Sequence, residues 1–288
     1  MAVTTTKATT VKLREMKQEG KKIVMLTAYD FPTARVAEEG GADMILVGDS
    51  LGMVVLGYET TLPVTMEDII HHTKAVTRGS KSTMIVADLP FLSYHISTPE
   101  TVRNAGRLIQ EGGADAVKIE GGREVIEGVE AIVRAGIPVV GHLGLQPQMV
   151  NQLGGFKVQG KDYESALRIF EDALMLQAAG CCAIVLECIP TPLTKLISEH
   201  LDIPTIGIGA GDTADGQVLV IHDMLGITDR YMPRFAKKYS ELFQEMTTAV
   251  NNYATEVRDS LFPTAQHSFK MNEDVLERLK SEINQRSY

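Results

Sequence analysis

Eight short apolar runs, rich in valine, isoleucine and leucine, recur along the chain between more polar segments that contain glycine. Runs that are apolar at consecutive positions, rather than at alternate ones, are typical of parallel strands covered on both faces. The pattern therefore predicts a parallel sheet with helices between its strands. The runs lie at residues 22–29, 44–49, 82–89, 116–121, 137–144, 182–188, 203–211 and 217–223.

Three of the segments between these runs have a helical pattern. Residues 161–180 carry apolar side chains at helical spacing and end on a glycine. Residues 32–41 and 98–114 each have a proline near the start and glycines near the end, which is the common arrangement at helix ends. Strands that alternate with such helices indicate repeated strand–helix units.

Eight strand–helix units predict an α/β fold, the (β/α)₈ TIM barrel. The connection between the last two strands is the weak point, because it is shorter than a parallel crossover normally needs. A doubly wound open sheet therefore stays the alternative fold. Residues 235–288 have helical patterns beyond the eighth strand. We expect residues 1–10 to form a flexible tail, and residues 11–288 to form a single barrel domain with additional C-terminal helices.

Length and charge narrow the class of protein. The chain has 288 residues, which suits one barrel of about 250 residues with additions. Its 28 basic and 37 acidic residues give a formal net charge of −9. This charge disfavours nucleic acid or an anionic membrane as the main partner. A local site can still bind an anionic small molecule through its own cations.

The three cysteines, Cys181, Cys182 and Cys188, crowd into one apolar stretch. A zinc site would need spaced pairs or nearby histidines, and a disulfide framework would need more cysteines in a shorter chain. Buried free thiols are the better interpretation, and they suit a reducing cytoplasm. No stretch approaches the roughly 18 apolar residues of a membrane-spanning helix.

Ionisable side chains close strands two to six of the expected barrel: Asp49, Asp88, Glu120, His142 and Glu187. Active sites of such barrels lie at the carboxyl ends of the strands, so these side chains are expected to share one site. Any single acid after a strand could instead cap the next helix. Their combination at corresponding positions favours a functional site.

Three of these acids, Asp49, Asp88 and Glu120, lie on neighbouring strands and would repel each other without a cation. Oxygen ligands with open positions favour Mg²⁺ over zinc. We therefore predict a magnesium site here. The structural alternative makes Asp88 a turn residue before Pro90, and Glu120 a loop acid before two glycines.

Lys118 strengthens this prediction. Lys118 and Glu120 are two residues apart on one strand, so their side chains point to the same face. A buried lysine needs an anionic partner, which could be a substrate carboxylate or Glu120 alone. His142 could orient a substrate or relay a proton, or it could be a hydrogen-bonded core residue.

Glu187 follows the sixth strand in the segment LECIP, among cysteine, isoleucine and proline. Desolvation in such surroundings raises the proton affinity of a carboxylate, which is useful in a general base near neutral pH. A buried acid satisfied by main-chain donors would fit the same segment. Both interpretations stay open at this point.

Seven motifs, in order through nearly the whole chain, resemble those of the ketopantoate hydroxymethyltransferase family. Several of them join an unusual pair of residues to a strand end, which makes the resemblance specific. The motifs are VGDSLG (47–52), ADLPF (87–91), VKIEGG (117–122), GHLGLQPQ (141–148), VLECIP (185–190), IGIGAG (206–211) and FPTAQHSF (262–269).

The resemblance implies a (β/α)₈ enzyme of pantothenate biosynthesis, related to the phosphoenolpyruvate mutase and isocitrate lyase superfamily. Such an enzyme transfers a hydroxymethyl unit from 5,10-methylenetetrahydrofolate to 3-methyl-2-oxobutanoate through an Mg²⁺-stabilised enolate, giving 2-dehydropantoate. It also implies a homo-oligomer, often a decamer. The implied roles are Asp49, Asp88 and Glu120 around the metal, Ser50 and Lys118 as binders of the oxoacid beside Asp49 and Asp88, and Glu187 as proton acceptor. His142 is added to the oxoacid site from its place on the fifth strand.

Two other functions remain as alternatives. One is a lyase or mutase of the same Mg²⁺-dependent oxoacid superfamily, although the cysteines lie by the sixth strand and not on a separate loop. The other is a barrel without catalysis that binds a small molecule or serves as a scaffold. We also expect residues 51–62, with their glycines and apolar side chains, to form a loop that closes over the substrate as a lid.

Overall fold

The computed structural model describes residues 7–153, 155, 157–228 and 232–286. The chain divides into two compact units, residues 1–240 and 241–288. Residues 1–6 of the expected tail lie outside the described residues, and α1 (Thr10–Gln18) begins within the predicted tail. Just before α1, the Lys7 ammonium lies 2.7 Å from a carboxylate oxygen of Asp115. The predicted domain boundaries stay a prediction.

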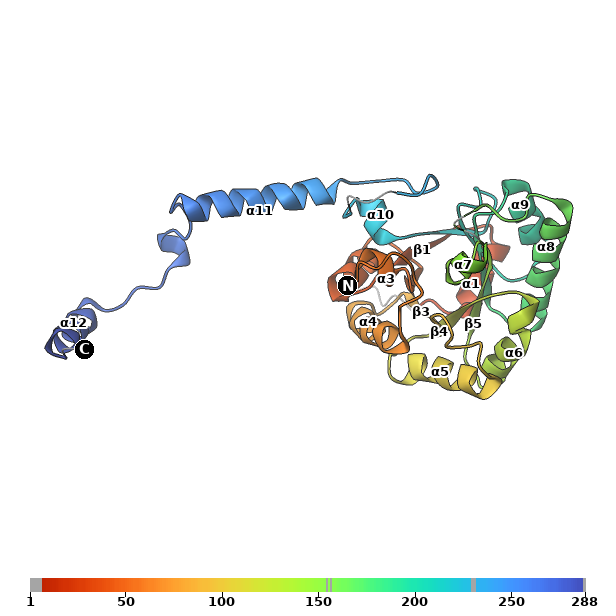
Figure 1. Ribbon diagram of the computed structural model, residues 1–288, viewed down its shortest axis with the longest axis horizontal. Coiled ribbons are helices and arrows are strands. Elements are labelled where there is room, and N and C mark those ends of the chain that lie inside the picture. Colours follow the sequence, from red (N-terminus) through yellow and green to blue (C-terminus); the bar gives the residue numbers. More distant parts are fainter. Residues whose placement is uncertain (1–6, 154, 156, 229–231, 287–288) are drawn as a thin grey trace. The chain divides into compact units, whose positions relative to one another are not determined.

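The first unit contains a closed barrel of eight parallel strands in chain order (Figure 1). Closure is direct, because β1 pairs with β8 in the register Ile23↔Gly216 to Leu26↔Leu219. The (β/α)₈ prediction is confirmed, and the open-sheet alternative is excluded. The strands are β1 (Ile23–Thr27), β2 (Met44–Val47), β3 (Met84–Asp88), β4 (Ala116–Glu120), β5 (Val139–Gly144), β6 (Ala183–Glu187), β7 (Thr205–Ile208) and β8 (Gly216–Leu219).

Helices follow most of these strands, and polar side chains fix where the predicted ones begin. The side chain of Asp30 caps the first, Ser97 the second and Asp162 the third. These three helices match the predictions to within a few residues: α2 (Phe31–Glu39), α5 (Thr98–Gln110) and α8 (Tyr163–Ala178). The other helices of the unit are α3 (Leu51–Val54), α4 (Met66–Gly79), α6 (Ile126–Arg134), α7 (Val150–Leu153), α9 (Thr191–His200) and α10 (Ile221–Leu225), with the 3₁₀ turns η1 (Arg123–Val125) and η2 (Pro147–Met149).

The connection from β7 to β8, residues 209–215, contains no helix, yet the two strands pair in parallel. Both strands are only four residues long, so the chain has a short way to travel back. Side chains hold the connection: Gln217 donates to the Gly211 carbonyl at 2.8 Å, and Lys22 donates to the Ala214 carbonyl at 2.5 Å. A short crossover is therefore compatible with closure.

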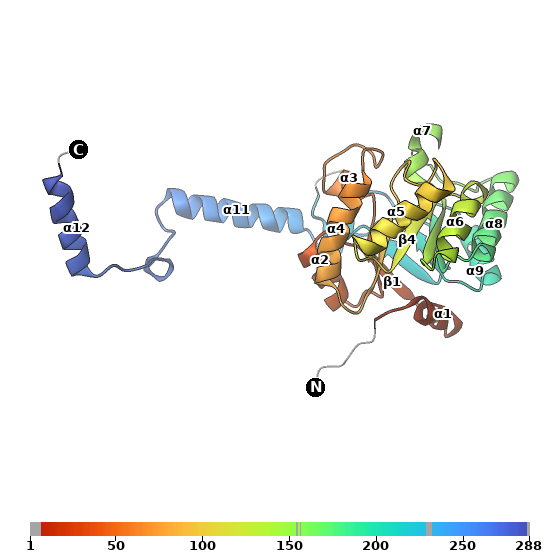
Figure 2. The ribbon, with the colours of Figure 1, turned by 90° about the horizontal axis from the view of Figure 1, so that it is seen from below.

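Alternate strand residues divide the core into two clusters. One packs between the barrel and its helices and includes Ile45, Ile85, Val117 and Ile184. The other fills the inside of the barrel and takes the intervening residues of the strands together with Leu13 and Met16 of α1. Figure 2 shows α1 at one end of the barrel and α3 and α7 at the other. The inner cluster contains Ile23, Met25, Met44, Leu46, Met84, Val86, Ala116, Val140, Ala183, Val185, Ile206 and Val218.

The second unit consists of α11 (Leu242–Arg258), the turn η3 (Ala265–His267) and α12 (Glu273–Gln285). The predicted C-terminal helices are therefore confirmed. Neither helix has a buried residue. Five exposed apolar side chains of α11 recur at alternating steps of three and four, at Phe243, Met246, Val250, Tyr253 and Val257. Throughout the part of the chain that the structure describes, no helix is long and apolar enough to cross a membrane.

Candidate active site

The predicted side chains continue the inner face of the barrel. The alternation of the inner cluster continues at Asp88, Lys118, Glu120, His142 and Glu187, so each projects inward. Asp88, Glu120 and Glu187 are the last residues of their strands. The strand register sets Asp88 beside Lys118, and Glu120 beside His142. The sequence alternation that fills the barrel with apolar side chains therefore also brings the ionisable groups together.

Asp49 joins them from the turn after β2. Its main-chain N–H donates to Asp88 Oδ2 at 3.0 Å, and its side chain is 4% exposed. Gly48 permits this approach. A Cβ at that position would lie 2.9 Å from Ser50 Oγ and 3.3 Å from Asp88 Oδ2, so a larger residue would displace the Ser50 hydroxyl and crowd Asp88. Close packing around position 48 therefore explains why a glycine precedes Asp49.

Lys118 pairs mainly with Asp88. Its Nζ lies 2.8 Å from Asp88 Oδ1 and 3.8 Å from Glu120 Oε1. The structural interpretation from sequence named Glu120 as the only protein partner, and the nearer carboxylate proves to be Asp88. Burial lowers the pKa of Lys118, but the carboxylates of Asp88, Glu120 and Asp49 outweigh it and raise the pKa. The ammonium therefore stays charged at neutral pH.

One ammonium does not balance three acids. Burial and the charges of Asp88 and Glu120 raise the pKa of Asp49 well above its usual range. Burial also raises the pKa of Asp88, although Lys118 opposes it. Burial acts the same way on Glu120, but His142 and Lys118 outweigh it and lower the pKa of Glu120. Crowded carboxylates of this kind attract a further cation.

His142 connects this cluster to Glu187. Its Nδ1 lies 3.2 Å from Glu120 Oε1, and its Nε2 lies 3.2 Å from Glu187 Oε2. Burial and the charge of Lys118 lower the pKa of His142, but the two glutamates outweigh them and raise it to about 9. The Glu187 side chain is 14% exposed, so it is the more accessible of the two glutamates. His142 is thus a charged bridge and not an isolated core histidine.

Ser50 is the first residue before α3, but its side chain makes no capping hydrogen bond to that helix. Its Oγ instead lies 2.9 Å from the hydroxyl of Tyr29, a buried side chain at the end of β1. The sequence did not single out Tyr29. Ser50 therefore presents a hydroxyl next to the acids that the helix does not use.

Gln148 and Tyr94 belong to the cluster and were also missed from the sequence. Gln148 Nε2 donates to Asp49 Oδ2 at 2.8 Å, and the Gln148 main-chain N–H donates to Glu120 Oε2 at 3.2 Å. The Tyr94 hydroxyl donates to Gln148 Oε1 at 2.7 Å. Gln148 ends the motif GHLGLQPQ, but nothing else in the sequence indicated that its side chain lies in the site.

The donor set fits a hard divalent cation. Among the described residues, no three histidine, cysteine or acidic side chains stand as a ready-made ligand set. Mg²⁺ does not need one, because it usually keeps several waters and takes one or two carboxylates. Asp49 and Asp88 could supply these oxygens, and each has one oxygen already held by an N–H group. Glu120 belongs to the same cluster, because it accepts from the main-chain N–H of Gln148 and lies 3.8 Å from the Lys118 ammonium.

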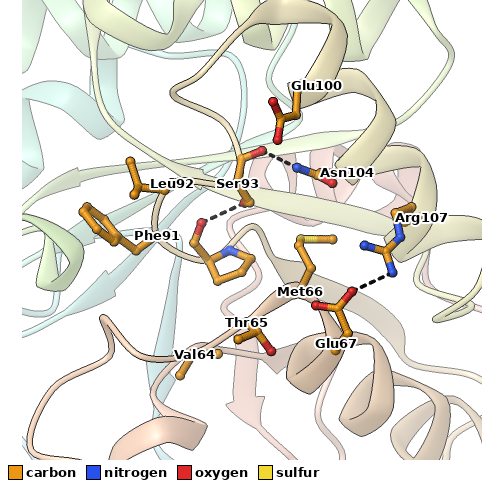
Figure 3. A pocket seen from close by; sticks show the side chains of 11 residues that line it. Val64, Thr65, Met66, Glu67, Phe91, Leu92, Ser93, Glu100, Asn104 and Arg107 are labelled. Atoms are coloured by element: carbon orange, nitrogen blue, oxygen red, sulfur yellow. Dashed lines mark hydrogen bonds and ion pairs between the residues drawn. The ribbon is translucent and has the colours of Figure 1, made fainter.

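Two cavities flank the barrel mouth. The first, of about 310 Å³, lies between α4, the segment after β3 and α5, where Glu67 and Arg107 form an ion pair (Figure 3). The second, of about 590 Å³, is lined by Gly144, Met149 and Arg168 among others. Gly144 pairs with Glu187 of the next strand, but the Glu187 side chain does not line this cavity.

The expected lid begins with α3. Leu51 is buried, and the Tyr58 main-chain N–H donates to the Gly52 carbonyl at 2.7 Å. Further along, Val55 and Leu56 are exposed. These contacts do not bear on movement, so the lid stays a prediction.

Comparison with known proteins first gives the class. The structure of 2,3-dimethylmalate lyase, a member of the phosphoenolpyruvate mutase and isocitrate lyase superfamily, superimposes over 96% of both chains with a TM-score of 0.53 at 15% identity. Phosphonopyruvate hydrolase in complex with oxalate and Mg²⁺ does so over 96% of both chains with a TM-score of 0.58 at 12% identity. The chain is therefore a barrel of this superfamily's fold.

The family follows from closer relatives. The 3-methyl-2-oxobutanoate hydroxymethyltransferase of Thermoanaerobacter sp. (strain X514) is 60% identical over 265 residues, which cover 92% of this chain and 97% of the relative. The family model of ketopantoate hydroxymethyltransferase matches residues 7–265. The chain belongs to the ketopantoate hydroxymethyltransferase family, as the seven motifs predicted.

Proposed function

We propose that the chain transfers a hydroxymethyl unit from 5,10-methylenetetrahydrofolate to 3-methyl-2-oxobutanoate, forming 2-dehydropantoate for pantothenate biosynthesis. Family membership and 60% identity to an enzyme of that name support the reaction. The observation that carries the proposal is the chain of contacts among ionisable residues at the barrel mouth, all buried except the partly exposed Glu187. It runs from Asp49 through Asp88, Lys118, Glu120 and His142 to Glu187.

Asp49 and Asp88 would hold one Mg²⁺, with Glu120 beside them. The bound ion would polarise the keto carbonyl of the oxoacid and stabilise the negative charge that develops on its oxygen. Support comes from the oxygen donors and from the crowding that raises the pKa of Asp49 and Asp88. The fold relative bound to oxalate and Mg²⁺ points the same way.

Lys118 and Ser50 would bind the carboxylate of the oxoacid. The Lys118 ammonium stays charged because three acids surround it, so it can pair with a further carboxylate once a divalent ion takes up the charge of Asp88. The Ser50 hydroxyl is free of helix capping and can donate to the same group. Two such contacts orient the small substrate toward the base.

Glu187 would accept the proton from C3 of the oxoacid. His142 lies 3.2 Å from Glu187 Oε2 and, when protonated, holds the side chain in place through that oxygen. The other carboxylate oxygen then remains to take the proton. Overall, a carbon–carbon bond forms between C3 and the methylene carbon, both carbon–nitrogen bonds of the methylene break, and water supplies the hydroxyl. Tetrahydrofolate takes up the C3 proton and one proton from water.

A homo-oligomer, a decamer by family resemblance, is part of the proposal. The exposed apolar stripe of α11, from Phe243 to Val257, supports it, because large apolar faces usually pack against a partner. A cytoplasmic location is supported by the free thiols of Cys181, Cys182 and Cys188, which suit a reducing compartment.

The deciding experiment is a turnover assay with 3-methyl-2-oxobutanoate, 5,10-methylenetetrahydrofolate and Mg²⁺, repeated with a chelator. We expect product only when all three are present and the chelator is absent. Isocitrate and phosphonopyruvate serve as rival substrates in parallel assays. Turnover of either rival without folate would replace the proposal by the lyase or mutase function. If none of the substrates is consumed in the presence of Mg²⁺, the alternative of a non-catalytic binding protein would apply.

A further inference from the structure

We infer that Gln148 is the positioning residue of the cation site, and that it fixes one carboxylate oxygen of Asp49 through its side-chain amide and one of Glu120 through its main-chain N–H. The inference rests on the proposed function, since it assumes that the acids bind a divalent cation. Gln148 lies in the turn η2, outside every strand, yet its residue is only 2% exposed. A buried amide must satisfy its donors and acceptor inside the protein.

The neighbours of Gln148 fix which way its amide faces. The Leu89 carbonyl lies 3.0 Å from Nε2 and can only accept, so the NH₂ group must lie on that side. The Tyr94 hydroxyl donates to Oε1 from the opposite side. Nε2 therefore presents its second N–H to Asp49 Oδ2 at 2.8 Å. This bond favours a carboxylate at Asp49, against the repulsion of the other acids.

All three acids share one pattern, in which a neutral N–H group holds one carboxylate oxygen. Asp49 Oδ2 accepts a hydrogen bond from the side-chain amide of Gln148, and Glu120 Oε2 accepts one from the main-chain N–H of Gln148. Asp88 Oδ2 receives the N–H of Asp49. Gln148 thus supplies two of the three bonds. Holding one oxygen of a ligand fixes the direction of the other, as outer hydrogen bonds do at metal sites.

Helix α5 secures Tyr94 in turn. Asn104 donates from its amide to the Ser93 carbonyl at 2.7 Å, a bond visible at the edge of the first cavity (Figure 3). The Thr101 hydroxyl donates to the Tyr94 carbonyl at 3.0 Å. The support therefore runs from α5 through Tyr94 and Gln148 to Asp49. None of these supporting side chains needs to touch the substrate.

The test measures divalent-cation binding without substrate, with Mn²⁺ as the probe and the free Mn²⁺ signal in electron paramagnetic resonance as the readout. Gln148→Met keeps the length and bulk of the side chain but removes its donors. Tyr94→Phe keeps the ring and removes only the hydroxyl. Gln146→Met, the same change two residues away, is the matched control. Thermal melting in chelator reports the folding of each variant.

We expect Gln148→Met to raise the Kd for Mn²⁺ by about 10- to 100-fold while melting in chelator changes little. Tyr94→Phe should raise it by about two- to tenfold, and Gln146→Met should leave it unchanged. A folded Gln148→Met protein with the Kd of the unaltered protein would overturn the inference. If Gln148→Met does not fold, Tyr94→Phe decides, and an unchanged Kd there overturns it. Failure of the unaltered protein to bind Mn²⁺ would remove the cation from the proposed function as well, which the first titration shows.

Discussion

At the amino end of the barrel, Glu38 of α2 accepts hydrogen bonds from the hydroxyls of Ser80 and Thr83 and from two main-chain amides. At the carboxyl end, Asp49 faces two further acids with one side-chain amide to help it. Partial burial raises the pKa of Glu38, but its four hydrogen bonds outweigh it and lower the pKa to about 2. Burial and repulsion instead raise that of Asp49.

Buried or partly buried acids therefore have different roles at the two ends of the barrel. Glu38 is satisfied by neutral donors that the chain itself provides, so its charge stabilises the fold. The acids of the mouth are only partly satisfied, which costs stability and creates a demand for a cation. Beneath them, Leu13 of α1 packs into the inner cluster and is fully buried. We therefore expect mutations at the two ends to separate loss of function from loss of stability.

The largest effect is expected from Glu187→Gln at the carboxyl end. The amide cannot accept the C3 proton, so exchange of that proton in deuterated solvent with Mg²⁺ should fall by about 10²- to 10⁴-fold. Proton magnetic resonance of the oxoacid measures this without folate. Melting should stay close to that of the unaltered protein. Rapid exchange of the C3 proton by the Glu187→Gln variant would show that Glu187 is not the base.

Leu13→Ala at the amino end should reduce stability and leave the active site intact. It leaves a cavity below the strands, and the free energy of unfolding in urea should drop by about 2–5 kcal/mol. The KM for the oxoacid should not change, because α1 lies at the other end from the acids. A large change in KM with an unaltered urea midpoint would break the proposed separation.

Glu38→Gln tests the amino-end charge through pH. Hydrogen bonds to a charged group typically contribute about 1.5–3 kcal/mol, so the variant should be less stable at neutral pH by up to that amount. Because the folded pKa lies below the unfolded value, this contribution is present above the unfolded pKa and is lost as pH falls through the folded pKa of about 2. Urea titrations between pH 7 and pH 2 should converge. A constant difference would contradict the assignment.

The smallest effect is expected from Arg35→Ala on the surface of α2. Arg35 pairs with Glu39 at 3.0 Å across one helical turn, and both side chains are mostly exposed. Such pairs contribute about 0.3–0.5 kcal/mol, and salt screens them. The urea midpoint should barely move, and less still at high salt. An effect as large as that of Glu38→Gln would show that pairing alone, and not burial, controls stability here.

Much of this architecture follows from local pattern. The eight apolar runs correspond to the eight strands, because most of these strands are buried on both faces and must be apolar throughout. β1 and β8 each have an exposed residue on the outer face. Alternation from Lys118 to Glu120 correctly placed both inside the barrel. The short connection after β7 was the reason to keep the open sheet as an alternative. That reason does not hold here, because β7 and β8 are only four residues long and need a shorter crossover.

The rest depends on closure of the barrel, which no local pattern contains. Gln148 bonds Asp49, and Tyr94 bonds Gln148 from a different segment of the chain. A glutamine beside a proline does not by itself indicate such a place. Lys118 lies closer to Asp88 than to Glu120 because the strand register sets Lys118 beside Asp88. Partners across strands follow from register, which the sequence of one strand does not specify.

The bond from the main-chain N–H of Asp49 to Asp88 has a consequence for genetics. Every residue except proline carries that N–H. A substitution such as Asp49→Asn therefore removes a carboxylate and leaves the anchor of Asp88 in place. A mutational scan would record Asp49 and Asp88 as independent positions, although the backbone of one holds the side chain of the other. Replacing that amide by an ester, through chemical synthesis of the chain, would remove the bond without changing either side chain.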